Sequence, residues 1–300
     1  MTVKGIFILL TVTLLTANCS AQSVPEFDEN SAYNYLLKQC DFGPRNPGSE
    51  GHEKCLHFLT SELRKYADNV KEQKFRYPLR KGEEPVTMTN VIANFNSRNP
   101  DRILLFAHWD TRPWADMDPD PAKHDTPIIG ANDGASGVAI LLEIARLIHM
   151  KAPPYGIDIL LVDGEDYGSY GDNDSWAIGS REFARNKSPN YRPRYGILLD
   201  LVGDRNLEIY IERFSYRYAP HIVDKIWARA EELGVVEFIP EPKFEVMDDH
   251  VRLMEAGIPC VDIIDFDYEY WHTVEDTPDK CSAGSLGKVG RVVTSVIYEK

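Results

Sequence analysis

Two adjacent carboxylates, Glu165 and Asp166, stand in the segment LVDGEDYG (residues 161–168), directly after an apolar, β-branched run. A solvated turn is the simplest interpretation, because Asp and Gly are ordinary turn formers. Carboxylates at the end of a strand also suit a metal ligand or a general base. With two adjacent acids, one can serve as a metal ligand and the other as a general base. The residues at the other predicted strand ends distinguish this interpretation from a solvated turn.

Ionisable side chains also stand at the other apolar runs that are predicted to be strands, and at the turns nearby. They are His108 after RILLFA, Asp133 in the glycine-rich turn GANDGASG, Asp200 at the end of YGILLD, and His272 after PCVDII and an aromatic loop. Each alone has an ordinary explanation, as a loop histidine, a helix cap or a turn residue. Ligands gather at the carboxyl ends of strands in open α/β sheets, so we expect one shared site.

The donor atoms of these side chains are nitrogen and oxygen, without thiolate. This set suits a catalytic Zn²⁺, which takes three protein ligands and keeps a position open. The candidates exceed the needs of one ion; they are His108, Asp133, Asp166, Asp200 and His272. They fit either a two-metal site bridged by Asp133 or a one-metal site with outer partners. Glu165, beside Asp166, is then placed as a general base.

Strand-like and helix-like segments alternate along most of the chain. Predicted strands cover residues 70–77, 89–95, 102–107, 156–162, 195–201, 207–211 and 259–264. Predicted helices cover residues 28–39, 50–66 with Ser49 as N-cap, 137–150, 180–186, 219–234, 249–257 and 285–300. Near-continuous apolar strands that alternate with helices indicate a mainly parallel sheet covered on both faces.

The composition is that of an ordinary globular protein and does not favour a nucleic-acid or membrane-surface partner. The chain has 300 residues, of which 43% are hydrophobic and 27% charged, enough for one sizeable core. Its formal net charge is −14, so partners such as nucleic acid or an anionic membrane are not expected.

The N-terminus has the layout of a secretory signal. Lys4 precedes the apolar run at residues 6–15, which is too short to span a bilayer, and small and polar residues follow. Cleavage after Ala21 would leave a single domain over residues 22–300. Alternatively, LTANC resembles a lipoprotein box, in which case Cys19 would carry a lipid anchor. We therefore expect export, to the periplasm or to a membrane facing it.

Export changes how the cysteines are interpreted. Apart from Cys19 the chain has an even number, namely Cys40, Cys55, Cys260 and Cys281. An oxidising compartment favours disulfides, and proximity along the chain favours the pairs Cys40–Cys55 and Cys260–Cys281. Four buried free thiols are the alternative.

The motifs AHWD, GANDGASGVAILLEIAR, DGED, ILLDLVGD, DDH and WHTVEDTPD, in this order, resemble the M28 zinc-peptidase fold family. Within it, they resemble the bacterial glutaminyl cyclases most closely, over nearly the whole chain after the signal. The resemblance implies an α/β single domain with a central mixed, mostly parallel sheet flanked by helices. It implies conversion of the N-terminal glutamine of peptides or proteins to pyroglutamate, with release of ammonia. The alternatives are an M28 zinc aminopeptidase and, in another class, a non-catalytic M28-like binding module.

The resemblance also implies a ligand set. In the cyclases, the residues matching Asp133, Asp166 and His272 hold one zinc ion. In the aminopeptidases, the matches to His108 and Asp200 bind as well, and two zinc ions are held. Because the chain has all five residues, the ligands alone do not separate the two activities.

Further roles follow from the same resemblance. Glu165 would move a proton, from the substrate amine in a cyclase or from water in a peptidase. Asp248 in MDDH, together with Asp200, matches carboxylates that work with this base. Trp271 matches an aromatic residue of the cyclase pocket. Without the resemblance, Trp271 would be a packing residue and Asp248 a helix N-cap.

The sequence departs from the animal cyclases around the pocket. Asp166 replaces a glutamate, and Asp262 replaces a histidine that we expect near the substrate. The insert at residues 112–126 resembles that of bacterial cyclases and is expected to cover the site. The candidates for aromatic pocket walls are Trp114, Tyr170 and Trp176.

Overall fold

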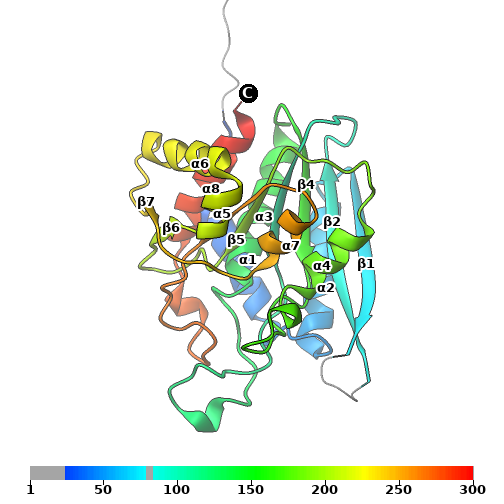
Figure 1. The fold of residues 1–300 in the computed structure, drawn as a ribbon, viewed down its shortest axis with the longest axis vertical. Helices are drawn as coiled ribbons and strands as arrows, with labels where there is room; N and C mark the ends of the chain where they lie inside the picture. The colour runs from blue at the N-terminus through cyan, green and yellow to red at the C-terminus, as the bar shows by residue number, and fades with distance from the viewer. Residues whose placement is uncertain (1–23, 79–83, 300) are drawn as a thin grey trace, which may run out of the picture.

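A twisted six-stranded sheet forms the centre of the computed structural model, which describes residues 24–78 and 84–299 (Figure 1). The strand order is β1-β2-β4-β3-β5-β8. The strands are β1 (Asn69–Tyr77), β2 (Val86–Phe95), β3 (Arg102–His108), β4 (Gly156–Val162), β5 (Gly196–Asp200) and β8 (Cys260–Ile264). Strands β4, β3, β5 and β8 run parallel, whereas β1 and β2 join antiparallel. The predicted mixed, mostly parallel sheet is confirmed.

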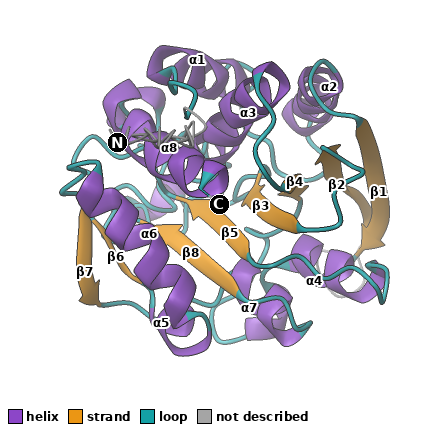
Figure 2. Cartoon of the chain, turned by 90° about the horizontal axis from the view of Figure 1, so that it is seen from above, coloured by secondary structure: helices purple, strands orange, loops and turns teal. Residues whose placement is uncertain are grey.

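Helices cover both faces of this sheet (Figure 2). On one face lie α1 (Glu29–Cys40), α2 (Glu50–Arg64), α3 (Ala135–Met150) and α8 (Ala283–Tyr298), and on the other lie α4 (Ile178–Asn186) and α7 (Asp249–Glu255). Beyond β8 stand α5 (Arg213–Tyr218), α6 (Pro220–Glu232) and a small parallel sheet of β6 (Ile209–Ile211) and β7 (Phe238–Pro242). Short 3₁₀ turns occupy Pro121–Lys123, Asn173–Ser175 and Pro278–Lys280.

The alternation of side chains along β3 explains why helices are needed on both faces. Leu105 and Ala107 belong to the large core beneath α1, α3 and α8. Leu104 and Phe106 point the other way, into a smaller core with Leu253 of α7. The central strands are therefore mostly apolar on both faces, with Asp158 in β4 and Asp262 in β8 as exceptions, and polar side chains gather at their carboxyl ends.

The predicted disulfides are not formed. Cys40, Cys55, Cys260 and Cys281 are all free thiols, as in the alternative interpretation. Cys260 packs in the core on the α7 face, whereas Cys281 packs in the core beneath α3. The sheet separates these two cysteines, so their proximity along the chain does not bring them together.

The predicted signal segment, including Cys19 and the cleavage point after Ala21, lies outside the described residues. Within residues 24–78 and 84–299, none of the helices combines the length and apolar character that crossing a membrane requires.

Candidate metal and catalytic centre

The carboxyl ends of β3, β4 and β5 meet at one edge of the sheet and bring the predicted residues together. His108 ends β3, Glu165 and Asp166 follow β4, and Asp200 ends β5. These strands are parallel neighbours, so side chains far apart in the sequence become adjacent. Asp133 joins them from the turn that precedes α3.

One convergent group consists of Asp133, Asp166 and His272, whose donor atoms all lie within 4.8 Å of one another. His272 Nε2 is 2.9 Å from Asp166 Oδ1 and 3.6 Å from Asp133 Oδ2. All three side chains are buried. Both oxygens of Asp166 and Oδ2 of Asp133 have no hydrogen-bond partner among the described residues. Buried carboxylate oxygens without donors need a cation, so this group fits a zinc ion.

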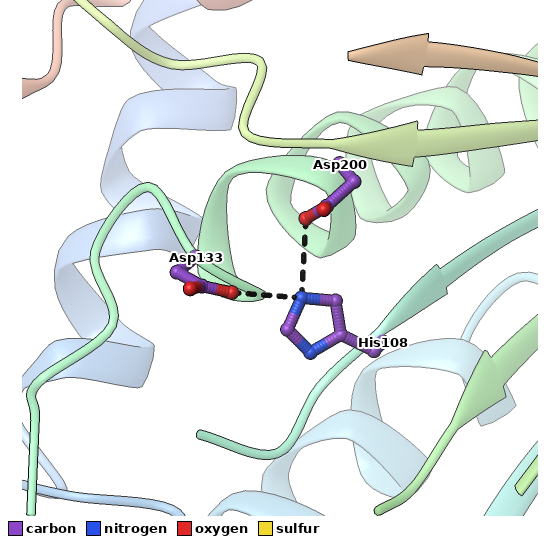
Figure 3. A group of neighbouring side chains, drawn as sticks. All are labelled: His108, Asp133 and Asp200. Atoms are coloured by element: carbon purple, nitrogen blue, oxygen red, sulfur yellow. Dashed lines mark hydrogen bonds and ion pairs between the residues drawn. The ribbon is translucent and has the colours of Figure 1, made fainter. Parts of the chain in front are cut away.

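A second group shares Asp133 with the first (Figure 3). His108 Nε2 lies 3.1 Å from Asp133 Oδ1 and 3.1 Å from Asp200 Oδ1. Burial and the neighbouring Asp166 carboxylate raise the pKa of Asp133 well above its ordinary value. All five candidate ligands are therefore in place, with Asp133 between the two groups as a bridging carboxylate would be.

Glycine 134 allows Asp133 to approach His108. Its φ is 88°, in the left-handed region that favours glycine, and a Cβ there would meet the Asp110 carbonyl oxygen at 2.7 Å. The tight turn therefore requires glycine, and it delivers the carboxylate and the start of α3 to the same point.

Two carboxylates that the sequence analysis did not single out hold the backbone of the site. Asp110 accepts hydrogen bonds from the backbone N–H groups of Glu165 and Asp166, at 3.2 and 3.3 Å. Asp276 accepts from the N–H of Asp133 at 3.1 Å. Both stand inside motifs quoted above, AHWD and WHTVEDTPD, but their type alone did not distinguish them from ligands.

Arg112 is a third residue that sequence reasoning missed. Its guanidinium donates to the backbone oxygens of Asp166 and Gly168 at 3.0 and 3.1 Å, and it pairs with the Asp116 carboxylate. It also lies 4.9 Å from the ring of Trp176. Arg112 therefore connects the loop after β4 to the insert at residues 112–126. The insert also contacts His272, because Met117 N donates a hydrogen bond to His272 O.

A cavity of about 200 Å³ opens onto these groups, roughly the volume of seven water molecules. The lining includes aromatic side chains, namely Tyr170, Trp176, Phe266 and Trp271. It also includes six carboxylates: Asp133, Glu165, Asp166, Asp200, Glu245 and Asp248.

Glu165 and Asp248 face this cavity as buried acids whose environments favour their protonated forms. Burial and the neighbouring Asp248 carboxylate raise the pKa of Glu165 well above its ordinary value. Burial and the Asp200 carboxylate raise the pKa of Asp248 to about 6. Acids of this kind, beside a metal group, are suited to take up and return a proton. Asp248 also caps α7, as its place before the helix predicted.

Two of the predicted substrate contacts lie elsewhere. Trp114 packs edge-on against Tyr167 with ring centroids 5.3 Å apart, and Arg112 lies 5.4 Å from its ring, so it is held outside the cavity lining. Asp262 is fully buried in the middle of β8, where its carboxylate lies 3.6 Å from His250 Nδ1. Neither residue belongs to the lining of the cavity, whereas Trp271, Tyr170 and Trp176 do.

Known proteins resemble the chain over most of its length. Residues 90–297 match the model of peptidase family M28. The glutaminyl cyclase of Tannerella forsythia is 42% identical, with a TM-score of 0.88, and the match covers 92% of this chain and 100% of that one. The Bacteroides thetaiotaomicron glutaminyl cyclase bound to N-acetylhistamine is 40% identical, with a TM-score of 0.90 and coverage of 93% and 100%.

A third structure, described as a leucine aminopeptidase precursor from Bacteroides thetaiotaomicron, is 41% identical, with a TM-score of 0.90 and coverage of 93% and 99%. Similarity at this level extends across the fold and the strand ends that carry the candidate site. The chain is a member of peptidase family M28, within the group that contains the bacterial glutaminyl cyclases.

Proposed function

We propose that the chain is a zinc-dependent glutaminyl-peptide cyclotransferase, which converts the N-terminal glutamine of peptides or proteins to pyroglutamate and releases ammonia. The observation that carries this proposal is the set of carboxylates around Glu165. Asp248 and Asp200 line the same small cavity, so three protonable acids surround one substrate-sized space beside the metal groups. The similarity to two bacterial glutaminyl cyclases supports the same reading.

Asp133, Asp166 and His272 would hold the zinc ion, and His108 and Asp200 would join them if a second ion were bound. A bound zinc would supply Lewis-acid polarisation of the γ-carbonyl group of the substrate. The unpartnered oxygens of Asp166 are the ligand atoms that the fold leaves free for it.

Glu165 would move the proton. The reaction forms a bond between the substrate α-nitrogen and its γ-carboxamide carbon, and breaks the bond from that carbon to the amide nitrogen. Glu165 takes a proton from the α-amino group during attack and returns it to the departing ammonia, so no proton is gained or lost. Asp248, whose pKa is raised to about 6 by burial and the Asp200 carboxylate, would keep Glu165 supplied with a neighbouring proton.

The aromatic lining would orient the substrate. The attacking amine and the amide carbon belong to the same residue, so holding them in a reactive geometry supplies much of the acceleration. Trp271, Tyr170 and Trp176 form flat walls around a space for one residue. Water is not a reactant in this cyclisation, and a narrow aromatic cavity favours a chemistry that needs none.

Exported chains with an N-terminal glutamine are the natural class of substrate for an exported enzyme. The N-terminal segment with Lys4 and the apolar run at residues 6–15 supports export, and Cys19 is the candidate for a lipid anchor. The mature N-terminus at Gln22 would itself be a substrate if cleavage follows Ala21.

One assay separates cyclase, aminopeptidase and binding module. Purified zinc-loaded protein is given the dipeptide Gln-Ala and, separately, Leu-p-nitroanilide, while ammonia and nitroaniline are measured. Ammonia with pyroglutamyl-alanine supports the proposal. Nitroaniline without ammonia would overturn the cyclase proposal in favour of an aminopeptidase, and the absence of both products would favour a binding role. A metal content near one zinc per chain is expected for the cyclase, and near two for the peptidase.

A further inference from the structure

A second group of buried ionisable side chains lies behind the cavity, apart from the metal groups. Its members are Glu212, the N-cap of α5, His250 in α7 and Asp262 in β8, each at most 1% exposed. One donor atom from each of Asp248, His250 and Asp262 lies within 4.8 Å of the others. Since Asp248 also lines the cavity, the group reaches the catalytic centre through that residue.

Glu212 fixes the orientation of the His250 ring, with its Oε2 3.1 Å from His250 Nε2. The same carboxylate accepts hydrogen bonds from the backbone N–H groups of Phe214, Ser215 and Val246. Although burial opposes ionisation, the bonds from His250 and the backbone lower the pKa of Glu212. An ionised carboxylate only accepts hydrogen bonds, so Nε2 carries a proton and Nδ1 is the variable position of the ring.

Asp262 is the member whose charge the surroundings do not satisfy. Both of its oxygens lack a hydrogen-bond partner in the described part of the chain, although the side chain is fully buried. Four other carboxylates face it, from Asp248, Glu212, Asp200 and Asp249. Burial and these charges raise the pKa of Asp262 well above its ordinary value. A proton on this group removes the conflict.

Three unpartnered atoms converge where that proton would lie. His250 Nδ1 is 3.6 Å from Asp262 Oδ2, and neither atom has a hydrogen-bond partner among the described residues. Asp248 Oδ2 is the third such atom. One proton shared between the imidazole and Asp262 satisfies that pair, and it removes the negative charge on Asp262 that would repel the Asp248 carboxylate. From the sheet side, Glu165, Asp200 and His108 face Asp248.

We propose that His250 and Asp262 are positioning residues that hold one proton behind Asp248, and that this shared proton keeps the Asp248 carboxylate in place beside Glu165 by removing the repulsion from an ionised Asp262. Glu212 serves by fixing the imidazole ring. No covalent bond is made or broken, and the proton stays within the group. The inference rests on the proposed function for its kinetic consequence, because Asp248 assists Glu165 in that reaction.

A histidine nitrogen and two carboxylates could instead bind a divalent cation, which is the competing occupant of the same space. The two cases need opposite charges on Asp262: neutral for a shared proton, ionised for a cation. Asp262→Asn separates them. Asparagine keeps the shape and an N–H donor but never ionises.

The experiment compares zinc-loaded wild-type protein with Asp262→Asn and Asp262→Ala, with Asp265→Asn as the matched control. Asp265 is a buried acid directly after β8 that belongs to neither group. Infrared difference spectra at neutral pH report protonated carboxylic acids without requiring turnover. Ammonia release from Gln-Ala between about pH 5 and about pH 9 gives the kinetic profile, and metal content is measured for each variant.

We expect a carboxylic-acid band that Asp262→Asn removes. Asp265→Asn should leave this band in place and remove only the separate signal of its own carboxyl, whose pKa burial raises to about 7. Asp262→Asn should keep kcat within about threefold of wild type, whereas Asp262→Ala should lose about tenfold or more, mostly in kcat, with a shifted acid limb. All variants should bind the same amount of metal, and Asp265→Asn should match wild type in activity.

Absence of the infrared band would overturn the inference, and so would equal losses of activity in the asparagine and alanine variants. Wild-type activity and a wild-type pH profile in Asp262→Ala would also overturn it. Loss of one metal equivalent in Asp262→Asn would replace the shared proton with a cation site. Wild-type protein that releases no ammonia would contradict the proposed function instead, and the infrared comparison would still test the inference.

Discussion

The hydroxyl of Tyr170 lies 3.0 Å from Nδ1 of His272, on the side of the ring opposite the nitrogen that faces Asp166. When Nε2 presents its lone pair to a metal ion, Nδ1 carries the proton and donates it to Tyr170. The Asp116 carboxylate stands 3.7 Å from the same Nδ1. A cavity-lining tyrosine thus orients the imidazole of a candidate ligand.

Tyr170→Phe should therefore weaken zinc binding by roughly tenfold or more, because the ring loses the partner that fixes its orientation and tautomer. Competition with a chromophoric chelator measures the affinity. Tyr216→Phe is the control, since Tyr216 is exposed on α5, outside the cavity lining. Equal zinc affinity in Tyr170→Phe and wild type would remove Tyr170 from this role.

Glu165→Gln should abolish most cyclisation, by about 100-fold or more, since the amide cannot take up the proton of the substrate amine. Zinc content should stay at the wild-type value, because Glu165 belongs to neither convergent metal group. Ammonia release and metal analysis on the same preparation check both halves of the prediction. Turnover close to wild type would assign the base elsewhere.

Removal of the metal should lower the melting temperature, since Asp133 and Asp166 would then face one another with unpartnered oxygens. Restoring zinc to 100 times its dissociation constant should return about 2.7 kcal/mol of stability. Calorimetry with and without chelator measures this difference. Asp166→Asn should reduce this stability difference, because the variant loses both the repulsion between the two carboxylates and one ligand of the zinc ion. An unchanged difference would argue against zinc binding at this group.

Asp265 should make stability fall as pH rises. Burial raises the pKa of its carboxyl to about 7, from an ordinary value of 3.8. Between these values the folded protein binds a proton that the unfolded chain has released, so stability is full at low pH and declines by at most about 1.4 kcal/mol per pH unit. Asp265→Asn should flatten the slope, since its Oδ1 can still accept from Glu208 N, as the carboxylate does at 2.9 Å. Denaturant titrations from acid to neutral pH measure it, and parallel wild-type and variant curves would contradict the assignment.

Most of the fold followed from local patterns. Ser49 caps α2 through a hydrogen bond from His52 N, as expected from its place before an amphipathic run. The apolar strands that became β3, β4, β5 and β8 were all identifiable, because burial on both faces removes polar residues from them. Strand β7 was missed, since its sequence FIPEP has two prolines and pairs only at a bulged edge.

The site was predictable where residue type and strand end coincide, as at His108, Asp166 and Asp200. The role of a residue was not predictable where it depends on the direction in which the side chain points. Asp262 lies in β8 between Val261 and Ile263, which face the large core, so its own side chain points to the α7 side. The resemblance to the cyclases identifies the position of Asp262 but not the residues around it, and in the structure Asp262 lies beside His250.

The backbone at His272 has φ 55°, a conformation that non-glycine residues adopt at some energetic cost. Consecutive side chains of an extended strand point to opposite sides, yet here the rings of Trp271 and His272 stack with centroids 3.8 Å apart. The cavity wall Trp271 and the candidate metal ligand His272 are consequently packed directly against each other. A substitution of Trp271 that is meant to widen the substrate range will therefore also change the zinc affinity, through the orientation of His272. The effects of substitutions at these two positions on activity will not be additive.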